Sequence, residues 1–201
     1  FCLKKDRFQD VVWIGTDGQG VYLYSNPLYS IKSMVLSNYT EKIERPVRAI
    51  YLDDERTFWV GTKGNGILKI YDYEFDKNIS DCRAEVLTTS NSALNSNAVY
   101  CFAKSHRNLL WIGDEEGLTY YSYREKRIKS IPIRIGNEDF KYIHDIYETA
   151  DSELWLASVG MGVVKARIAG TPDNPVIVDA QRYIINDGEL GSNYFFTIYA
   201  E

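Results

Sequence analysis

The four tryptophans of the chain stand in closely similar surroundings, and this repetition limits the possible folds more than any other feature. They lie at positions 13, 59, 111 and 155, so that the spacings are 46, 52 and 44 residues. Each follows an apolar residue and precedes an apolar residue and a small one, as in Val12-Trp13-Ile14-Gly15. A period of this length indicates a repeat architecture. The sequence therefore divides into approximate repeats 1–40, 41–92, 93–137 and 138–190, with 191–201 starting a further one.

Within each repeat the pattern predicts four antiparallel strands, A to D, with the tryptophan on strand B. Strand A is expected at 47–52, 99–103 and 143–147, and strand C at 21–24, 67–70, 118–121 and 163–165. Glycine-containing turns separate strands B and C, because glycine reaches positive φ without steric cost. A weaker strand D is expected at 31–36, 84–87, 128–133 and 180–183. Four such strands at this period are typical of β-propeller blades, so we expect an all-β fold.

The amino-acid composition agrees with this fold and limits the classes of partner that we expect. Hydrophobic residues make up 45%, and 16 Tyr and 8 Phe against 2 Met favour strands. The net charge of −5 makes nucleic acid an unexpected partner. No apolar stretch is long enough to cross a bilayer, so we expect no membrane insertion by this segment. No metal or cofactor motif is present, and we expect no cofactor.

The repeated residues are expected to be structural. We assign this role to Trp13, Trp59, Trp111, Trp155, Gly15, Gly61 and Gly113. The indole rings are predicted to fill the space between neighbouring blades. Trp13 is expected to be less important than Trp59, because no blade precedes it.

The segments Trp13–Tyr24 and Trp59–Ile70 carry the pattern W-[IV]-G-T-x-x-x-G-[VIL] after an acidic turn. In this the chain resembles the two-component regulator propeller repeat, over essentially its whole length. The lead-in Leu94–Val99 is similar to that family's entry into strand A. The resemblance implies a periplasmic sensor segment of a hybrid histidine kinase, anchored through segments outside this chain, that binds a saccharide or oligosaccharide.

Nothing in the sequence forms a convincing catalytic set, and we expect no catalytic activity in this segment. His106 lies in a polar turn and His144 on a strand, neither near a nucleophile motif. Adjacent carboxylates such as Asp53 and Asp54 fall in turns. Two alternatives stay open: a structural or protein-interaction propeller, and a propeller-fold glycan lyase or glycosidase.

Ligands of propellers usually meet the face made by the D–A and B–C loops. The residues entering strand A on that face are Arg48, Asn97, Tyr142 and Asn193, and Asp17, Lys63 and Asn65 should rim it. Arg and Asn suit hydroxyl and carboxylate recognition, and a Tyr ring offers a platform for a sugar face. The alternative is that these residues only satisfy backbone groups of the turns.

We expect a strand A at each end of the chain, whereas a propeller normally closes by completing its last blade with strands from both chain ends. One is at 1–3 and the other at 194–199, the first strand of a fifth blade. Two A strands cannot occupy one place, so we predict four blades in an open arc of a larger propeller, seven-bladed in the family it resembles. The remaining blades of the parent propeller are then expected partners. In isolation the segment is expected to self-associate, for example as a homodimer.

Overall fold

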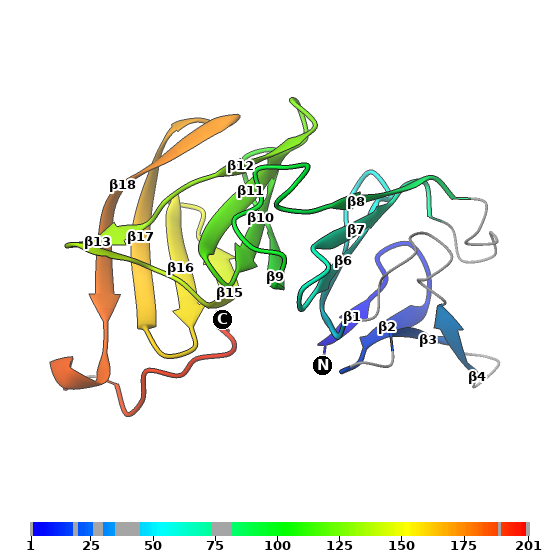
Figure 1. Cartoon of the computed structure of the whole chain (residues 1–201), viewed down its shortest axis with the longest axis horizontal. Helices are drawn as coiled ribbons and strands as arrows, with labels where there is room; N and C mark the ends of the chain where they lie inside the picture. Colours follow the sequence, from blue (N-terminus) through cyan, green and yellow to red (C-terminus); the bar gives the residue numbers. More distant parts are fainter. Residues whose placement is uncertain are drawn as a thin grey trace. The chain divides into compact units, whose positions relative to one another are not determined.

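The structure, a computed structural model, describes residues 2–17, 20–25, 30–34, 45–73, 82–188 and 190–199. The chain divides into two compact units (Figure 1). The first unit holds Phe1–Thr88 with Asn97–Val99, and the second holds Thr89–Ser96 with Tyr100–Glu201.

The first unit contains two antiparallel sheets of four strands each. The first sheet has the order β1 (Cys2–Lys5), β2 (Val11–Gly15), β3 (Val21–Ser25) and β4 (Ser30–Met34). The second has the order β5 (Val47–Leu52), β6 (Phe58–Thr62), β7 (Ile67–Ile70) and β8 (Ala84–Leu87). Consecutive strands are neighbours throughout, which is the meander that the repeat predicts.

The second unit contains two more sheets of the same kind and a short hairpin. The third sheet runs β9 (Val99–Lys104), β10 (Leu109–Asp114), β11 (Gly117–Ser122) and β12 (Arg127–Ser130). The fourth runs β15 (Ile143–Glu148), β16 (Glu153–Ser158), β17 (Gly162–Thr171) and β18 (Asn174–Tyr183). Between them, β13 (Arg134–Ile135) pairs with β14 (Glu138–Asp139). The all-β prediction is confirmed, with one tryptophan on the second strand of every sheet.

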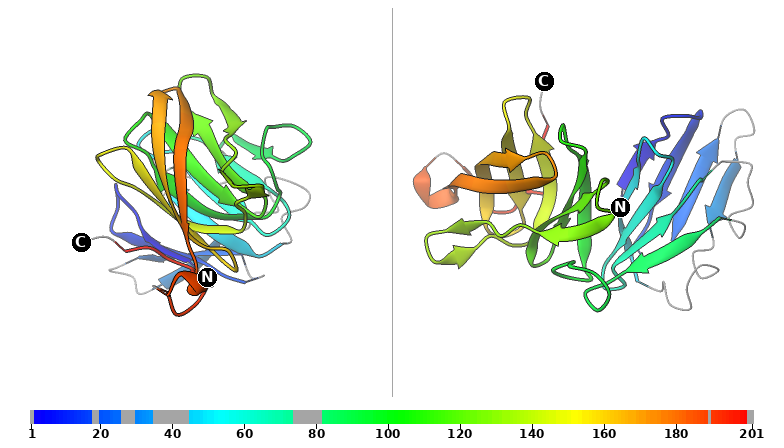
Figure 2. Two further views of the ribbon diagram at one scale, coloured as in Figure 1. Left: turned by 90° about the vertical axis from the view of Figure 1, so that its left-hand side faces the viewer. Right: turned by 90° about the horizontal axis from the view of Figure 1, so that it is seen from above.

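The strand boundaries differ most from the prediction in the third and fourth sheets. The fourth strand of the third sheet ends at Ser130 rather than 133, because the chain leaves to form the β13–β14 hairpin. Strands β17 and β18 each have 10 residues and form a hairpin that extends beyond β15 and β16 (Figure 2). The end of the strand expected at 31–36 lies outside the described residues.

The strand expected at 194–199 is not assigned. Its entry is as predicted, since Tyr194 forms a bridge with Val159 and the Phe195 N–H donates to the Ser158 carbonyl. Beyond this point no second strand among the described residues pairs with it. A strand needs a partner for its backbone groups, so the segment stays irregular.

The core of the first unit lies between its two sheets. Trp13 on β2 is 1% exposed and packs against Phe58 and Tyr73 of the second sheet, with ring centroids 4.5 and 5.1 Å away. The tryptophan therefore packs on the blade that follows it. The expectation that Trp13 lacks a neighbour, because no blade precedes it, is wrong.

The second unit repeats this arrangement. Trp111 is fully buried in a core that contains Ile143 and Ile146 of the following sheet. Gly113 permits the close approach of that sheet, because a Cβ there would lie 2.7 Å from the Ile143 carbonyl oxygen. Trp155 on β16 is only partly buried, because no further sheet among the described residues covers it.

Buried carboxylates bind the indole N–H groups, but they come from two different places. In the first unit, Trp13 Nε1 donates to Asp6 and Trp59 Nε1 to Asp53, both at 2.9 Å, and each aspartate lies in the A–B turn of the same sheet. In the second unit, Trp111 Nε1 donates to Glu148 at 2.7 Å, and Glu148 ends the first strand of the next sheet. The acidic turn that the sequence shows thus has a structural role.

Candidate functional site

One backbone clasp recurs where a B–C turn meets the entry to the next strand A. In the first unit, the N–H groups of Gly64 and Gly66 both donate to the Asn97 carbonyl, at 2.9 Å. In the second unit, the N–H groups of Gly160 and Gly162 donate to the Asn193 carbonyl, at 2.9 and 3.0 Å. The face made by the D–A and B–C loops is therefore built on turns that the following segment holds in place.

The structure brings part of the predicted site together in the first unit. Arg48 Nη2 lies 3.7 Å from Asp17 Oδ1, and the Arg48 Nε is buried without a hydrogen-bond partner among the described residues. Lys63 is exposed, and its backbone N–H donates to the Pro46 carbonyl. The side-chain oxygen of Asn65 accepts from the backbone N–H of Arg45 at 3.1 Å.

Two predicted residues lie in the second unit. Tyr142 is 41% exposed and adopts a φ of 55°, and its backbone bonds to Glu115 and Val159. The side-chain oxygen of Asn193 accepts from the Ile185 N–H at 2.8 Å. The contacts described for Asn65, Asn97 and Asn193 thus stabilise turn backbone, while Arg48, Asp17, Lys63 and Tyr142 present side chains to solvent.

Beside Tyr142 the second unit contains a cleft of about 320 Å³ that the sequence did not indicate. The B–C turn of the third sheet and the two D–A connections on either side of that sheet form its walls. It is lined by Asn95, Glu116, Gly117, Leu118, Ser130, Pro132, Ile133, Arg134, Asp139, Phe140 and Lys141. Its volume lies at the lower end of the usual range for small-molecule sites, roughly 300–1,000 Å³. This cleft is our candidate site.

A buried carboxylate supports the cleft wall. Asp114 is 0% exposed, and its Oδ1 accepts from the N–H groups of Glu116 and Gly117, both at 2.9 Å. Its Oδ2 is buried and has no hydrogen-bond partner among the described residues. Burial raises the pKa of Asp114 to about 7, although nearby backbone N–H groups, including those of Ser96 and Asn95, lower it. A titratable group therefore underlies the two segments that flank the cleft.

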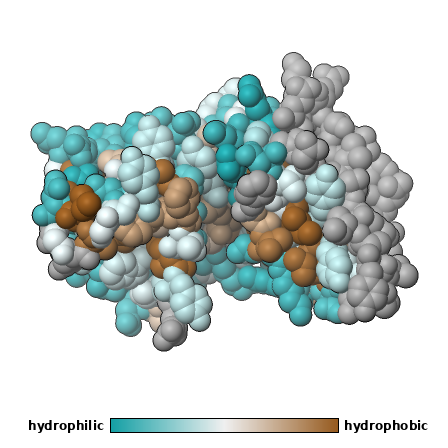
Figure 3. Space-filling model, turned by 90° about the horizontal axis from the view of Figure 1, so that it is seen from below, coloured by the Kyte–Doolittle hydropathy of each residue, from teal (hydrophilic) through white to brown (hydrophobic). Residues whose placement is uncertain are grey.

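An aromatic row lies on the strand-A side of the second unit. The His144 ring stacks on Tyr100 with centroids 4.2 Å apart, and Phe196 meets it edge-on at 5.4 Å. His144 thus packs among aromatic rings, while His106 is exposed as expected. Phe196 is 65% exposed. Figure 3 shows one face of the molecule, where hydrophobic patches lie among mostly hydrophilic surroundings.

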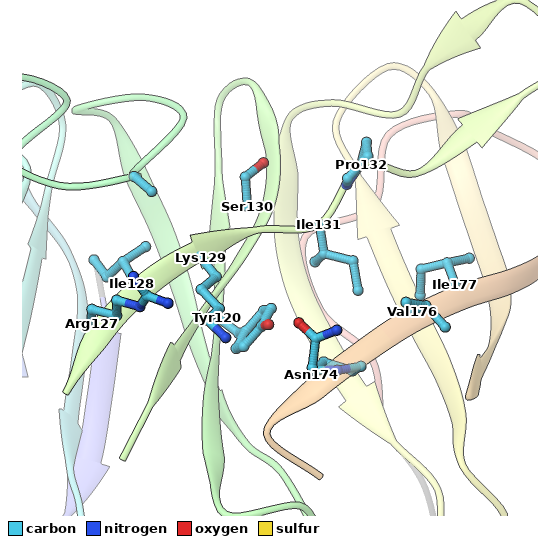
Figure 4. A pocket seen from close by; sticks show the side chains of 12 residues that line it. Tyr120, Arg127, Ile128, Lys129, Ser130, Ile131, Pro132, Asn174, Val176 and Ile177 are labelled. Atoms are coloured by element: carbon cyan, nitrogen blue, oxygen red, sulfur yellow. The ribbon is translucent and has the colours of Figure 1, made fainter. Parts of the chain in front are cut away.

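A larger groove, of about 660 Å³, lies between β12 and the extended β17–β18 hairpin (Figure 4). Ile131, Val176 and Ile177 contribute apolar walls, and Tyr120 lies between the two strands. The charged groups Arg127 and Lys129 both bind Glu125. The groove lies along the outer strands of the sheets, away from the B–C turns, and we do not assign the ligand site to it.

Comparison with solved structures identifies the architecture. The chain matches PorZ, a surface component of the type-IX secretion system of Porphyromonas gingivalis, with a TM-score of 0.69 and 14% identity over 98% of this chain. It matches the extracellular domain of BT3049, assigned as a hybrid two-component system of B. thetaiotaomicron, with a TM-score of 0.68 and 22% identity over 96%. The extracellular domain of BT4673 matches with a TM-score of 0.61 and 14% identity over 96% of this chain. The chain has the fold of a β-propeller segment.

The chain spans 29%, 24% and 32% of those three structures, respectively, so it corresponds to part of a larger propeller assembly in each. No family model matches the chain. Translation initiation factor 6 of Saccharolobus solfataricus is 31% identical over 140 residues, which are 63% of this chain and 57% of that factor. That coverage does not place the chain in the factor's family. Among the described residues no helix has the length and apolar character of a membrane span.

Proposed function

We propose that this chain is part of the periplasmic, ligand-sensing propeller of a hybrid two-component regulator, and that it binds its ligand without turnover. The match to the BT3049 extracellular domain over 96% of the chain is the observation that carries the proposal. The repeat pattern around Trp13 and Trp59 supports it independently. The cleft on the face made by the D–A and B–C loops is a suitable place for a small saccharide.

The lack of an assembled catalytic set within the described residues supports binding rather than catalysis. Glu115 contacts Ser96, Glu116 contacts Lys141, and Glu148 is occupied by Trp111 and Ser105. The similarity to PorZ supports a second candidate, a surface propeller that binds a partner protein.

The proposal is tested in the organism that encodes the chain. The gene of the parent protein is deleted, and transcription is profiled during growth on a panel of purified polysaccharides. We expect one polysaccharide to lose its induced genes, with induction restored by the intact gene. Unchanged profiles on every polysaccharide, or appearance of cleaved product when the chain is incubated with the panel, would contradict the proposal.

A further inference from the structure

The charged side chains that line the cleft are already paired with one another. Lys141 Nζ lies 2.5 Å from Glu116 Oε2, and Arg134 Nε lies 2.9 Å from Asp139 Oδ1. Both pairs join residues within the cleft lining, so its two positive and two negative groups balance. Both pairs are partly exposed, and within each pair one charge offsets the other, so the cleft has no excess of either sign to attract an ionic ligand.

The polar side chains that stay available in the cleft are uncharged. Asn95 uses its Nδ2 to donate to the Leu118 carbonyl at 3.3 Å, and no hydrogen bond to its Oδ1 occurs among the described residues. Ser130 is exposed at the cleft, and its hydroxyl makes no hydrogen bond within the described part of the chain. The Asn95 Oδ1 can thus accept a hydrogen bond from a ligand, and the Ser130 hydroxyl can both donate and accept one. Both groups suit the neutral hydroxyls of a ligand.

The cleft also has an apolar component. Leu118, Ile133 and Phe140 line it and are at most 3% exposed. Gly117 lies against them with a φ of 143°, and a Cβ at this position would lie 3.2 Å from the Phe140 carbonyl oxygen. The absence of a side chain at Gly117 therefore allows its backbone to lie close to Phe140 in the wall of the cleft. These buried apolar side chains form the floor of the cleft, and a ligand here needs hydroxyl groups toward Asn95 and Ser130.

We propose that this cleft binds a neutral saccharide unit and rejects uronate and other anionic saccharides. The inference rests on the proposed function and deepens it by naming the ligand class. A pyranose ring carries neutral hydroxyls, which match the available side-chain groups of Asn95 and Ser130. An anionic ligand would meet Glu116 or Asp139 unless it displaced them from Lys141 or Arg134, and a carboxylate left unpaired beside another is unfavourable.

The experiment uses the whole chain and a glycan array of neutral and uronate-containing oligosaccharides, followed by calorimetric titration of the best neutral and the best acidic compound. We expect binding of neutral compounds. Ser130→Ala removes one hydrogen bond and should weaken that binding about five- to tenfold. Glu116→Gln frees the Lys141 ammonium and should bring measurable binding of uronate compounds. Gln181→Ala, at an exposed position on β18 away from the cleft, is the control and should change neither.

Each other outcome overturns the inference. Wild-type preference for uronate compounds, or unchanged neutral binding in both Ser130→Ala and Asn95→Ala, shows that this cleft does not select neutral saccharides. Absence of all saccharide binding by a chain that still shows its cooperative melting transition also overturns the inference. In these cases the induction experiment still decides the sensor function, since it reads the parent protein and not this cleft.

Discussion

The two units solve the same packing problem with different residues. In the first unit, Asp53 both caps its own A–B turn and accepts the indole N–H of Trp59. In the second unit, Ser105 takes the turn position, and Glu148 from the next sheet accepts both the Trp111 N–H and the Ser105 hydroxyl. The comparison teaches that Trp13, Trp59 and Trp111 share a buried carboxylate beside the indole, not a particular residue in the turn. In the second unit that carboxylate also ties two sheets together.

The largest effect should come from the tryptophans themselves. Trp13→Ala removes a buried ring from the core of the first unit, and we expect a loss of about 3–5 kcal/mol of unfolding free energy. Trp155→Ala removes a partly exposed ring that stacks on Tyr183, and should cost about 1–3 kcal/mol. Urea unfolding followed by fluorescence of the remaining tryptophans measures both. Equal losses would contradict the packing of each indole on the following sheet.

Changes to the buried carboxylate of the second unit should have the next largest effect on the free energy of unfolding. Glu148→Ala leaves the Trp111 N–H and the Arg107 guanidinium without their buried partner, and should cost about 3–5 kcal/mol. Ser105→Asp alone places two carboxylates together and should also destabilise the second unit.

The double variant Ser105→Asp with Glu148→Ala recreates the arrangement of the first unit. We expect it to recover at least about 1 kcal/mol relative to Glu148→Ala, as a double-mutant cycle would show. Additive losses would mean that the two arrangements are not interchangeable, and that the carboxylate must come from the next sheet.

A pH dependence distinguishes the B–C turns of the units. Thr62 holds the turn in the first unit, whereas Asp114 occupies that position in the second and has a pKa of about 7 against an ordinary 3.8. Because the folded state holds the proton more tightly than the unfolded state, stability should fall as pH rises from about 4 to 7 and then level off. Asp114→Thr should remove this slope, which corresponds to about 2–4 kcal/mol. Urea unfolding at pH 4.5 and 8 would test it, and an unchanged slope in the variant would contradict the assignment.

The sequence predicted the sheets well because their signals are local. Alternating apolar residues and glycine turns lie within a few residues of each tryptophan, so the strands near Trp13, Trp59 and Trp111 were placed correctly. The partner of Trp111 could not be predicted, because Glu148 lies 37 residues away and reaches it only through packing of the next sheet.

The candidate cleft was missed for a related reason. Arg134 and Asp139 face it only because β13 and β14 form a hairpin, and the Gly136-Asn137 pair at its turn was an unused signal for that hairpin. Asp114 was a second unused signal, since it stands where Trp59-Val60-Gly61-Thr62 has a threonine. Of the predicted residues, Arg48 lies on β5, whereas Asn97 and Asn193 lie after β8 and β18, where their carbonyls hold a B–C turn. Ligand contact by these residues stays a prediction.

The clasp at Asn97 and Asn193 means that a blade is not an autonomous module. In the second and fourth sheets the carbonyl that holds the B–C turn belongs to the segment that follows the sheet, so part of the order of these two blades is supplied from outside their own strands. Stability in such an array is a sum of repeat and neighbour terms. A single blade grafted into another propeller would therefore need the lead-in of the blade after it, so the useful unit for recombination extends past the repeat boundaries at 92 and 190 to include Asn97 or Asn193.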